Sequence, residues 1–321
     1  METANATLND AVVAAVRDGL ERSPKKLPSW LLYDDEGDRL FQQIMHMPEY
    51  YPTRCEYDLL TRHKDDILRL FDAERTGFQL IELGAGDGLK IEILLNHFVR
   101  RGANLVYNPV DISANALAML QERLHASIPD LRINPQNKSY DEALSDLASS
   151  NQKKVILFMG ANIGNFNIRQ AVEFLKRVSS VMNTNDLLLV GFDLKKDPRI
   201  IQEAYDDPRG LTAKFNLNLL HRLNKELNAN FDIDQFSHYP YYDPETGAMK
   251  SFLISMKDQY VFIPAIGKSI HFGLWEAVQT EISQKYDLYM IEKIMTLAGL
   301  RIHHVFSDCD GYFADVVAGV V

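Results

Sequence analysis

The segment that most constrains the fold of this chain is 78–90, with the sequence F-Q-L-I-E-L-G-A-G-D-G-L-K. Its apolar run 80–83 breaks at Gly84, Gly86 and Gly88, after which apolar residues recur at helical spacing. This pattern predicts a buried parallel strand, a glycine turn and a helix, the first unit of a doubly wound sheet. Ligands of such sheets bind at the carboxyl ends of the strands, and glycine lets the backbone approach them closely. We therefore expect a nucleoside-containing cofactor at this turn.

A regular alternation of strand and helix patterns surrounds this segment. Strands are predicted over 78–83, 105–110, 131–135, 154–159 and 187–194. Helices are predicted over 88–100, 113–125 and 167–181, with a weaker pattern over 141–149. A closing hairpin is predicted from 302–306 and 312–320. The alternation predicts an α/β fold with a parallel sheet and right-handed crossovers.

The rest of the chain has a different pattern and predicts a second, α+β domain. Before the sheet, the patterns indicate a helix over 8–21, an apolar linker over 25–34, a helix over 35–45, a proline-bracketed turn over 47–54 and a helix from Thr53 to about Leu70. After it, they indicate helices within 197–228, antiparallel strands within 233–275 and a helix over 286–297. We expect a sheet domain formed by 62–195 and 287–321, and a second domain formed by 1–61 and 196–286.

Composition and charge exclude several classes of function. A formal net charge of -10 argues against nucleic acid as the main partner, because phosphate binding relies on Lys and Arg. Two cysteines, Cys55 and Cys309, indicate neither a disulfide framework nor a zinc site and fit a reducing compartment. The sequence shows no signal-peptide pattern and no 18-residue apolar run. We expect a monomeric cytoplasmic protein that binds no metal, membrane or nucleic acid.

The spacing of the glycines bears on which cofactor they hold. A dinucleotide site needs G-x-G-x-x-G with an acidic residue about 20 positions later, whereas this turn reads G-A-G-D-G. Glu82, just before the turn, would repel a pyrophosphate. E-L-G-A-G followed by an aspartate that ends the second strand resembles the S-adenosylmethionine (SAM) site of class I methyltransferases. The resemblance implies that Gly84 and Gly86 line SAM and that both oxygens of Asp111 accept its ribose hydroxyls. Alternatively, the glycines only tighten the turn and Asp111 caps the next helix.

Asn165 follows the fourth strand, in the string A-N-I-G-N-F. The carboxyl end of that strand faces the transferred group in this fold. The side-chain carbonyl of Asn165 could orient an acceptor amine there. Equally, Asn165 could cap the helix that begins near Ile168.

Six motifs together resemble the histidine-specific SAM-dependent methyltransferase family, over nearly the whole chain from about Lys25 to Val321. They are M-P-E-Y-Y-P-T-R, E-L-G-A-G, G-A-N-I-G-N, A-Y-D-D, A-K-F-N and T-E-I-S. Its best-known members trimethylate the α-amine of histidine on the way to ergothioneine. The resemblance implies a class I SAM-methyltransferase fold, a Rossmann-like doubly wound sheet with a second α+β substrate-binding domain, and SAM as cofactor.

The resemblance also implies roles for individual residues. Tyr50 and Tyr205 would donate hydrogen bonds to the substrate carboxylate, and Asn165 would hold the α-amine, so Asn165 and Tyr50 are the expected catalytic residues. Glu281 and Ser283 would bind the imidazole, and their i, i+2 spacing puts them on one face of an extended segment. The other implied contacts are Phe41 and Gly160 for the substrate, and Glu82, Gly84, Gly86, Lys90, Asp111, Ser139 and Tyr140 for SAM.

Each of these residues also has a structural reading: a Tyr-Tyr-Pro turn is often packing, Tyr205 could belong to the core, and Glu281 could be a solvated charge at a helix end. Three positions depart from the family pattern. Ser139 precedes Tyr140 where many relatives have an acidic residue, Asn162 replaces a threonine, and Ser251 replaces a methionine. The acceptor and the number of methyl groups therefore stay open.

The expected chemistry is direct displacement by a neutral amine, with orientation as the protein's main contribution. No general base is assigned, and water and Tyr50 are both open as proton routes. Three rival functions are a methyltransferase for another amino acid or amine, a nicotinamide oxidoreductase, and a non-catalytic module that binds SAM or an amine.

Overall fold

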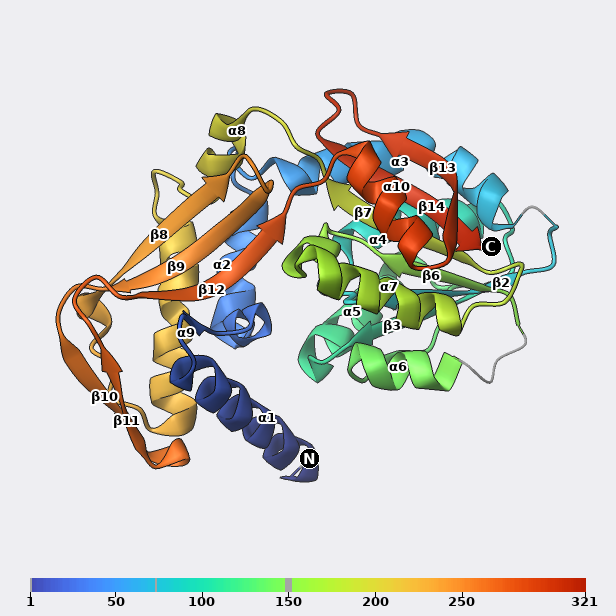
Figure 1. The fold of residues 1–321 in the computed structure, drawn as a ribbon. Helices are drawn as coiled ribbons and strands as arrows, with labels where there is room; N and C mark the ends of the chain where they lie inside the picture. Colours follow the sequence, from blue (N-terminus) through green and yellow to red (C-terminus); the bar gives the residue numbers. More distant parts are fainter. Residues whose placement is uncertain (1, 73, 148–151) are drawn as a thin grey trace. The chain divides into compact units, whose positions relative to one another are not determined.

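The computed structural model describes residues 2–72, 74–147 and 152–321, which form two compact units (Figure 1). Unit 1 comprises Met1–Tyr51 and Lys196–Ser283, and unit 2 comprises Pro52–Lys195 and Gln284–Val321. The first predicted boundary, 61/62, falls inside helix α3 (Tyr51–Phe71), whereas the units divide where this helix begins. The ring of Phe71 packs against Phe78 and Phe98, so α3 shares its apolar contacts with unit 2.

Unit 2 is built on an eight-stranded sheet, and its order is β13-β14-β7-β6-β2-β3-β4, with β5 paired to β3. Its strands are β2 (Phe78–Leu83), β3 (Leu105–Asp111), β4 (Arg132–Ile133), β5 (Gln136–Asn137), β6 (Lys154–Phe158), β7 (Leu187–Asp193), β13 (Leu300–Ser307) and β14 (Phe313–Val320). The pairs from β4 to β7 are parallel, whereas β14 is antiparallel to both β7 and β13. The predicted parallel sheet and closing hairpin are therefore confirmed, and the single strand expected over 131–135 is two short ones.

The remaining elements of unit 2, besides α3, are α4 (Leu89–Arg100), α5 (Ala114–Ser127), α6 (Tyr140–Leu147), the 3-10 turn η2 (Asn162–Asn165), α7 (Ile168–Ser180) and α10 (Leu288–Leu297). The predicted helix 141–149 corresponds to α6, and its positions 148 and 149 lie outside the described residues. One apolar core joins α6, α7 and α10 to the sheet, with Phe158, Phe174 and Ile294 among its members. Figure 1 shows α7 and α10 beside each other, where they are in contact.

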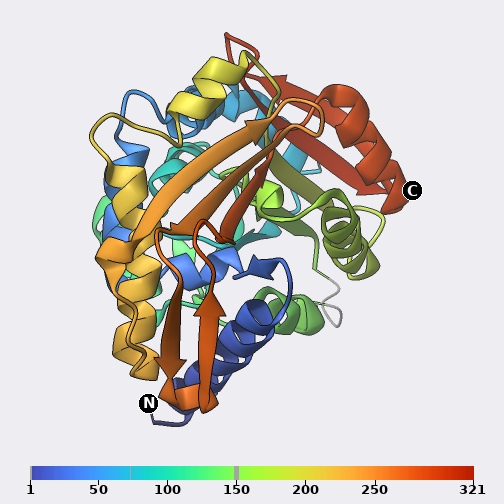
Figure 2. The same cartoon turned by 60° about the vertical axis from the view of Figure 1, so that its left-hand side comes forward.

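Unit 1 combines helices with a four-stranded sheet of order β1-β12-β9-β8 and a separate β10–β11 hairpin (Figure 2). Its helices are α1 (Glu2–Glu21), α2 (Asp35–Met45), α8 (Pro198–Glu203) and α9 (Leu211–Leu227). Its strands are β1 (Lys25–Lys26), β8 (Phe236–Asp243), β9 (Ala248–Ser255), β10 (Gln259–Ile263), β11 (Lys268–Phe272) and β12 (Ala277–Gln284). Three 3-10 turns complete it, η1 (Ser29–Leu32), η3 (Ile233–Gln235) and η4 (Pro264–Ile266). Helix α9 packs on α2, β8 and β9 around a core that includes Phe215 and Leu253.

Two local predictions in unit 1 were wrong in part. The stretch 25–34 is more than a linker, because β1 pairs in parallel with β12 and η1 buries Leu31 and Leu32. The turn predicted over 47–54 is shorter, because α3 already begins at Tyr51. Pro52 stands in the first turn of that helix, where a missing N–H group costs no intrahelical hydrogen bond.

No helix in the described part of the chain is long and apolar enough to cross a membrane.

Candidate active site

The glycine turn after β2 leaves open space on one side. Gly84, Gly86 and Gly88 all have left-handed backbone angles, with φ of 78°, 52° and 62°, which glycine adopts without strain. The Gly84 N–H donates to the Val110 carbonyl at 2.8 Å. A Cβ at Gly84 would lie 2.6 Å from the hydroxyl oxygen of Tyr140, but a Cβ at Gly86 would meet no atom within 4 Å. The turn is thus closed at Gly84 and open at Gly86, as a cofactor lying over it requires.

Asp111 ends β3 beside this open space. One of its carboxylate oxygens accepts from the Gly86 N–H at 3.0 Å, and the other accepts from the Ser113 N–H at 2.9 Å. Ser113 is the N-cap of α5, because its hydroxyl accepts from the Ala116 N–H, so the reading of Asp111 as the helix cap is wrong. Each carboxylate oxygen retains a second lone pair, so Asp111 can still accept hydrogen bonds from a cis-diol. The geometry fits the ribose of SAM.

The loop after β6 comes close to the same turn. A Cβ built on Gly160 would lie 3.1 Å from the ammonium nitrogen of Lys90, and the Asn162 amide nitrogen would lie 3.4 Å from a Cβ on Gly84. The carboxyl ends of β2 and β6 therefore bring Gly84, Lys90, Gly160 and Asn162 together. Figure 1 shows these two strands as neighbours in the sheet.

Asn165 ends the 3-10 turn η2 of this loop and is partly buried. Helix α7 is capped by Asn167, whose side chain forms a reciprocal capping box with Gln170. The alternative reading of Asn165 as that cap is therefore wrong. Its proposed contact with an acceptor amine stays a prediction.

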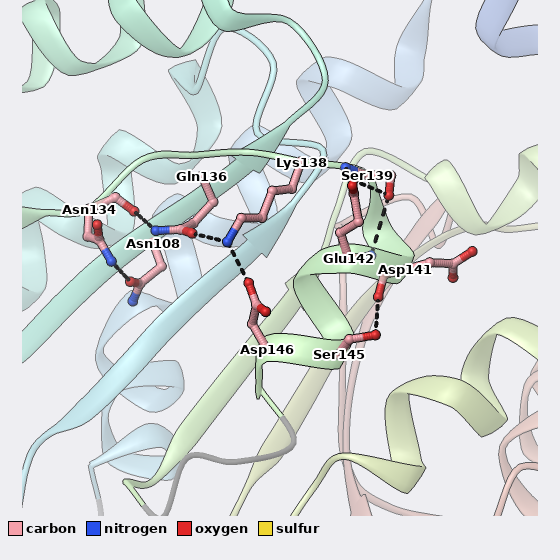
Figure 3. A network of polar contacts seen from close by, with 9 residues as sticks. All are labelled: Asn108, Asn134, Gln136, Lys138, Ser139, Asp141, Glu142, Ser145 and Asp146. Atoms are coloured by element: carbon pink, nitrogen blue, oxygen red, sulfur yellow. Dashed lines mark hydrogen bonds and ion pairs between the residues drawn. The ribbon is translucent and has the colours of Figure 1, made fainter. Parts of the chain in front are cut away.

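Ser139 and Tyr140 stand at the start of α6, and Ser139 belongs to the polar network of Figure 3. The Ser139 hydroxyl donates to the Glu142 carboxylate at 2.7 Å, and the Ser139 N–H donates to the same oxygen at 2.9 Å. Lys138 binds Asp146, which ties the preceding strand to the helix. Ser139 thus has a structural partner, and its proposed contact with adenine stays a prediction.

Tyr140 is held by aromatic neighbours. Its ring centroid lies 5.6 Å from that of Phe158 and 6.0 Å from that of Phe174. These contacts fix a rigid ring whose hydroxyl lies against Gly84. Tyr140 can therefore form a wall of the cofactor site.

Glu82 is buried in β2, and its carboxyl group accepts a hydrogen bond from the Tyr107 hydroxyl. Burial raises the pKa of Glu82 to about 8, although the Tyr107 hydrogen bond and the Lys90 charge both act to lower it. The carboxyl is therefore largely protonated at pH 7. The repulsion of a pyrophosphate expected from Glu82 is correspondingly reduced, and the proposed contact of Glu82 with SAM stays a prediction.

Three of the residues expected to bind the substrate lie in an aromatic cluster of unit 1. The ring centroid of Tyr50 lies 5.9 Å from that of Phe41 and 6.3 Å from that of Tyr205, both edge-on. Phe41 also contacts Tyr33 and Phe215, at 5.5 and 5.8 Å. The structure thus brings together Phe41, Tyr50 and Tyr205, which come from three separate parts of the sequence.

Tyr33 is a member of this cluster that the sequence did not single out. Burial raises the pKa of its phenol well above the ordinary value, and the nearby charge of Glu281 adds to the shift. Tyr50 and Tyr205 contribute smaller effects in the same direction, so both phenols lie near that of Tyr33. The one sequence feature that could have drawn attention to Tyr33 is its position directly before Asp34, the N-cap of α2.

Glu281 and Ser283 lie within β12, so the reading of Glu281 as a charge at a helix end is wrong. The Ser251 hydroxyl on β9 donates to one Glu281 carboxylate oxygen at 3.0 Å. Glu281 is partly exposed, whereas Ser283, two residues further along the strand, is buried. Ser251, the position that departs from the family pattern, thus binds a residue expected to recognise the substrate.

Unit 2 has the strand order of a class I SAM-dependent methyltransferase, in which the last strand of the chain, here β14, is antiparallel and lies between the preceding strand β13 and the parallel strands. The family model described as "Histidine-specific methyltransferase, SAM-dependent" matches residues 12–320. The chain belongs to this family and is a SAM-dependent N-methyltransferase.

Three relatives illustrate the range of acceptors among similar proteins. The chain is 32% identical to a histidine N-alpha-methyltransferase of Mycobacterium tuberculosis, over 93% of this chain and 91% of the relative. It is 33% identical to a histidine N-alpha-methyltransferase of Mycolicibacterium smegmatis, over 95% and 93%. It is also 29% identical to an L-tryptophan methyltransferase of Psilocybe serbica, over 89% and 87%. Relatives at similar sequence identity are therefore named for different acceptors, histidine and tryptophan.

Proposed function

We propose that this protein transfers methyl groups from SAM to the α-amine of L-histidine, up to the trimethylated product hercynine of the ergothioneine pathway. The observation that carries the proposal is the cluster in unit 1, where the Tyr33 phenol lies near those of Tyr50 and Tyr205 and is influenced by the charge of the Glu281 carboxylate. Phenols can recognise a carboxylate without adding a cation, and a carboxylate can accept the N–H of an imidazole. Together these groups are complementary to histidine.

On the acceptor side, Tyr50 and Tyr205 donate to the substrate carboxylate, and Phe41 packs beside it. One carboxylate oxygen of Glu281 accepts from the Ser251 hydroxyl, and the other accepts the imidazole N–H of the substrate. Ser283 pairs with the second imidazole nitrogen. These assignments give every polar group of histidine except the α-amine a partner in unit 1.

On the cofactor side, Gly86 and Asp111 hold the nucleoside, Tyr140 and Ser139 border its base, and Lys90 pairs with the methionine carboxylate. When bound, SAM would supply an activated methyl group, which an uncharged amine can accept as the S–C bond breaks and S-adenosylhomocysteine leaves. Asn165, with the Gly160 loop, orients that amine through its side-chain carbonyl. Orientation of this kind can lower a barrier by up to roughly 7–11 kcal/mol.

The test is incubation of the protein with SAM and an equimolar panel of amino acids, followed by mass spectrometry. The expected result is L-histidine carrying one, two and then three additional methyl groups, with other amino acids unchanged.

The second candidate acceptor is L-tryptophan, which the relative from Psilocybe serbica favours and whose indole N–H could also bind Glu281. Methylation of tryptophan and not histidine would refute the proposed acceptor and leave SAM chemistry intact. Binding of SAM and histidine without any methylated product would instead support a non-catalytic module.

A further inference from the structure

A fully buried carboxylate in unit 2 connects two of the expected site residues. Glu56 on α3 binds the Lys90 ammonium, and its two oxygens accept from the Gly160 N–H at 2.8 and 3.1 Å. Lys90 is an expected SAM contact, and Gly160 begins the loop that carries Asn165. Glu56 thus joins the start of α4 to the loop after β6, although it belongs to neither.

Gly191 in the middle of β7 makes room for this carboxylate. A Cβ at Gly191 would lie 2.7 Å from a carboxylate oxygen of Glu56 and 3.1 Å from two ring atoms of Phe313. The backbone of Gly191 does not have a left-handed φ, so its conformation alone does not require glycine. Glycine weakens a strand interior and often marks a close approach of another group. The strand is therefore shaped around the Glu56 side chain.

Asp315 on β14 pairs with Gly191 and is also completely buried. Neither of its carboxyl oxygens has a hydrogen-bond partner among the described residues. Burial raises the pKa of Asp315 well above its usual range, and the charge of Glu56 adds to the shift. The Lys90 ammonium pairs with Glu56, the same carboxylate that accepts from the Gly160 N–H.

We infer that Glu56 is a positioning residue for SAM, which holds the Lys90 ammonium and the Gly160 backbone in place and cancels the Lys90 charge. The inference rests on the proposed contact between Lys90 and the methionine carboxylate. SAM carries a net charge of +1 through its sulfonium, whereas its product S-adenosylhomocysteine is neutral overall. An uncompensated Lys90 would therefore repel SAM more strongly than the product.

The test is Glu56→Gln, with the affinities of SAM and S-adenosylhomocysteine measured by titration calorimetry. We expect SAM affinity to fall about tenfold or more, and the ratio of SAM to S-adenosylhomocysteine affinity to fall at least about threefold, because only the charge of the ligand differs. Glu56→Asp keeps the charge on a shorter side chain. It should weaken both ligands together and leave their ratio within about twofold of wild type.

Hydrogen–deuterium exchange of the cofactor-free protein gives a second readout. The peptide that contains Gly160 should exchange faster in Glu56→Gln, because its N–H loses the carboxylate. Asp186→Asn is the matched control. Asp186 forms a second buried ion pair of unit 2, with Lys154 at 3.0 Å, and this pair lies where β6 and β7 begin, at the end of the strands away from Gly160. Asp186→Asn should lower stability without changing the affinity ratio or Gly160 exchange.

An unchanged affinity ratio in folded Glu56→Gln would overturn the inference, as would an equal fall of the ratio in Glu56→Asp. If Glu56→Gln does not fold, Gly191→Ala takes its place, because it displaces the carboxylate, and unchanged exchange at Gly160 would then count against the inference. Lys90→Met with unaltered affinity for both ligands would refute the proposed SAM contact itself. A shifted ratio in a protein that methylates no amine would keep the inference and refute the proposed acceptor.

Discussion

Substituting Glu281 by alanine tests the proposed recognition of the imidazole most directly. The carboxylate lies on β12 and already accepts one hydrogen bond, from Ser251 at 3.0 Å. A hydrogen bond between its second oxygen and a ring N–H would be charge-assisted, and such bonds contribute about 1.5–3 kcal/mol. Because about 1.4 kcal/mol corresponds to a factor of ten, histidine should bind roughly 10- to 150-fold more weakly to Glu281→Ala.

The same substitution also affects the folded protein without ligand. The buried Ser251 hydroxyl would lose its acceptor, at a cost of about 1–3 kcal/mol in the free energy of unfolding. Ser251→Ala is the matched control, because it removes the hydroxyl and keeps the carboxylate. Its effect on histidine affinity should stay within about tenfold, the loss expected for one neutral hydrogen bond.

The assay is titration of L-histidine into protein saturated with S-adenosylhomocysteine, which prevents turnover during the measurement. Thermal unfolding of each variant separates a binding defect from a folding defect. If folded Glu281→Ala binds histidine within about twofold of wild type, Glu281 does not contact the imidazole, since even one charge-assisted bond exceeds that effect.

Three further predictions concern single residues of the two units. Tyr50→Phe keeps the ring and removes the phenol, so histidine affinity should fall about 10- to 150-fold by calorimetry, as for any lost hydrogen bond to a charged group; unaltered affinity and turnover would refute its role in binding the substrate carboxylate. Gly86→Ala and Gly102→Ala each place a Cβ where no atom lies within 4 Å, on a backbone with positive φ, and each should cost about 1–2 kcal/mol of stability in denaturant titrations. SAM affinity should fall at least about tenfold in Gly86→Ala alone, since only that Cβ would meet the cofactor; equal SAM affinity in both variants would place the cofactor elsewhere. Glu82 has its pKa raised from 4.5 to about 8, so its stabilising effect is complete below pH 4.5 and is lost as the pH rises through 8. That effect is on the order of 5 kcal/mol at most, and unfolding of Glu82→Gln between pH 4.5 and 8 should therefore depend less on pH than that of wild type; parallel curves would contradict the assignment.

The fold of unit 2 could be predicted from the sequence because its signals are local. The long parallel strands β2, β3, β6 and β7 are largely apolar runs that end at or next to glycine or a polar residue, and the helices between them show regular apolar spacing. Every described helix and strand of unit 2 that was predicted begins and ends within about two residues of its predicted bounds. The position of the cofactor turn follows from the same local pattern, since the carboxyl ends of parallel strands lie at one edge of the sheet.

The partners of individual side chains could not be predicted in the same way. Tyr33 joins the candidate site through the charge of Glu281, and nothing in the string L-L-Y-D indicates that contact. Ser251 was noticed only as a departure from the family pattern, but its significance comes from its position on β9, within reach of Glu281 on β12. Such pairs depend on which strands meet, and the strand pairing of unit 1 leaves little local signal.

The buried ion pairs of unit 2 show why a contact must be interpreted with its surroundings. Lys154 and Asp186 form a pair with both side chains 1% exposed, and the Asp186 carboxylate also accepts from the backbone N–H groups of Lys154 and Asn183. This pair therefore closes the turn before β7. Burying two charges costs several kcal/mol, and well-packed apolar residues can often replace such a pair without loss of stability. The Glu56–Lys90 pair closes no turn in its own part of the chain. Local structure therefore explains the cost of burying these two charges less well than it does for Lys154 and Asp186. The contacts of the Glu56–Lys90 pair lead instead to the start of α4 and to the loop after β6, which both border the cofactor turn, and this difference favours positioning of SAM as the reason for its presence.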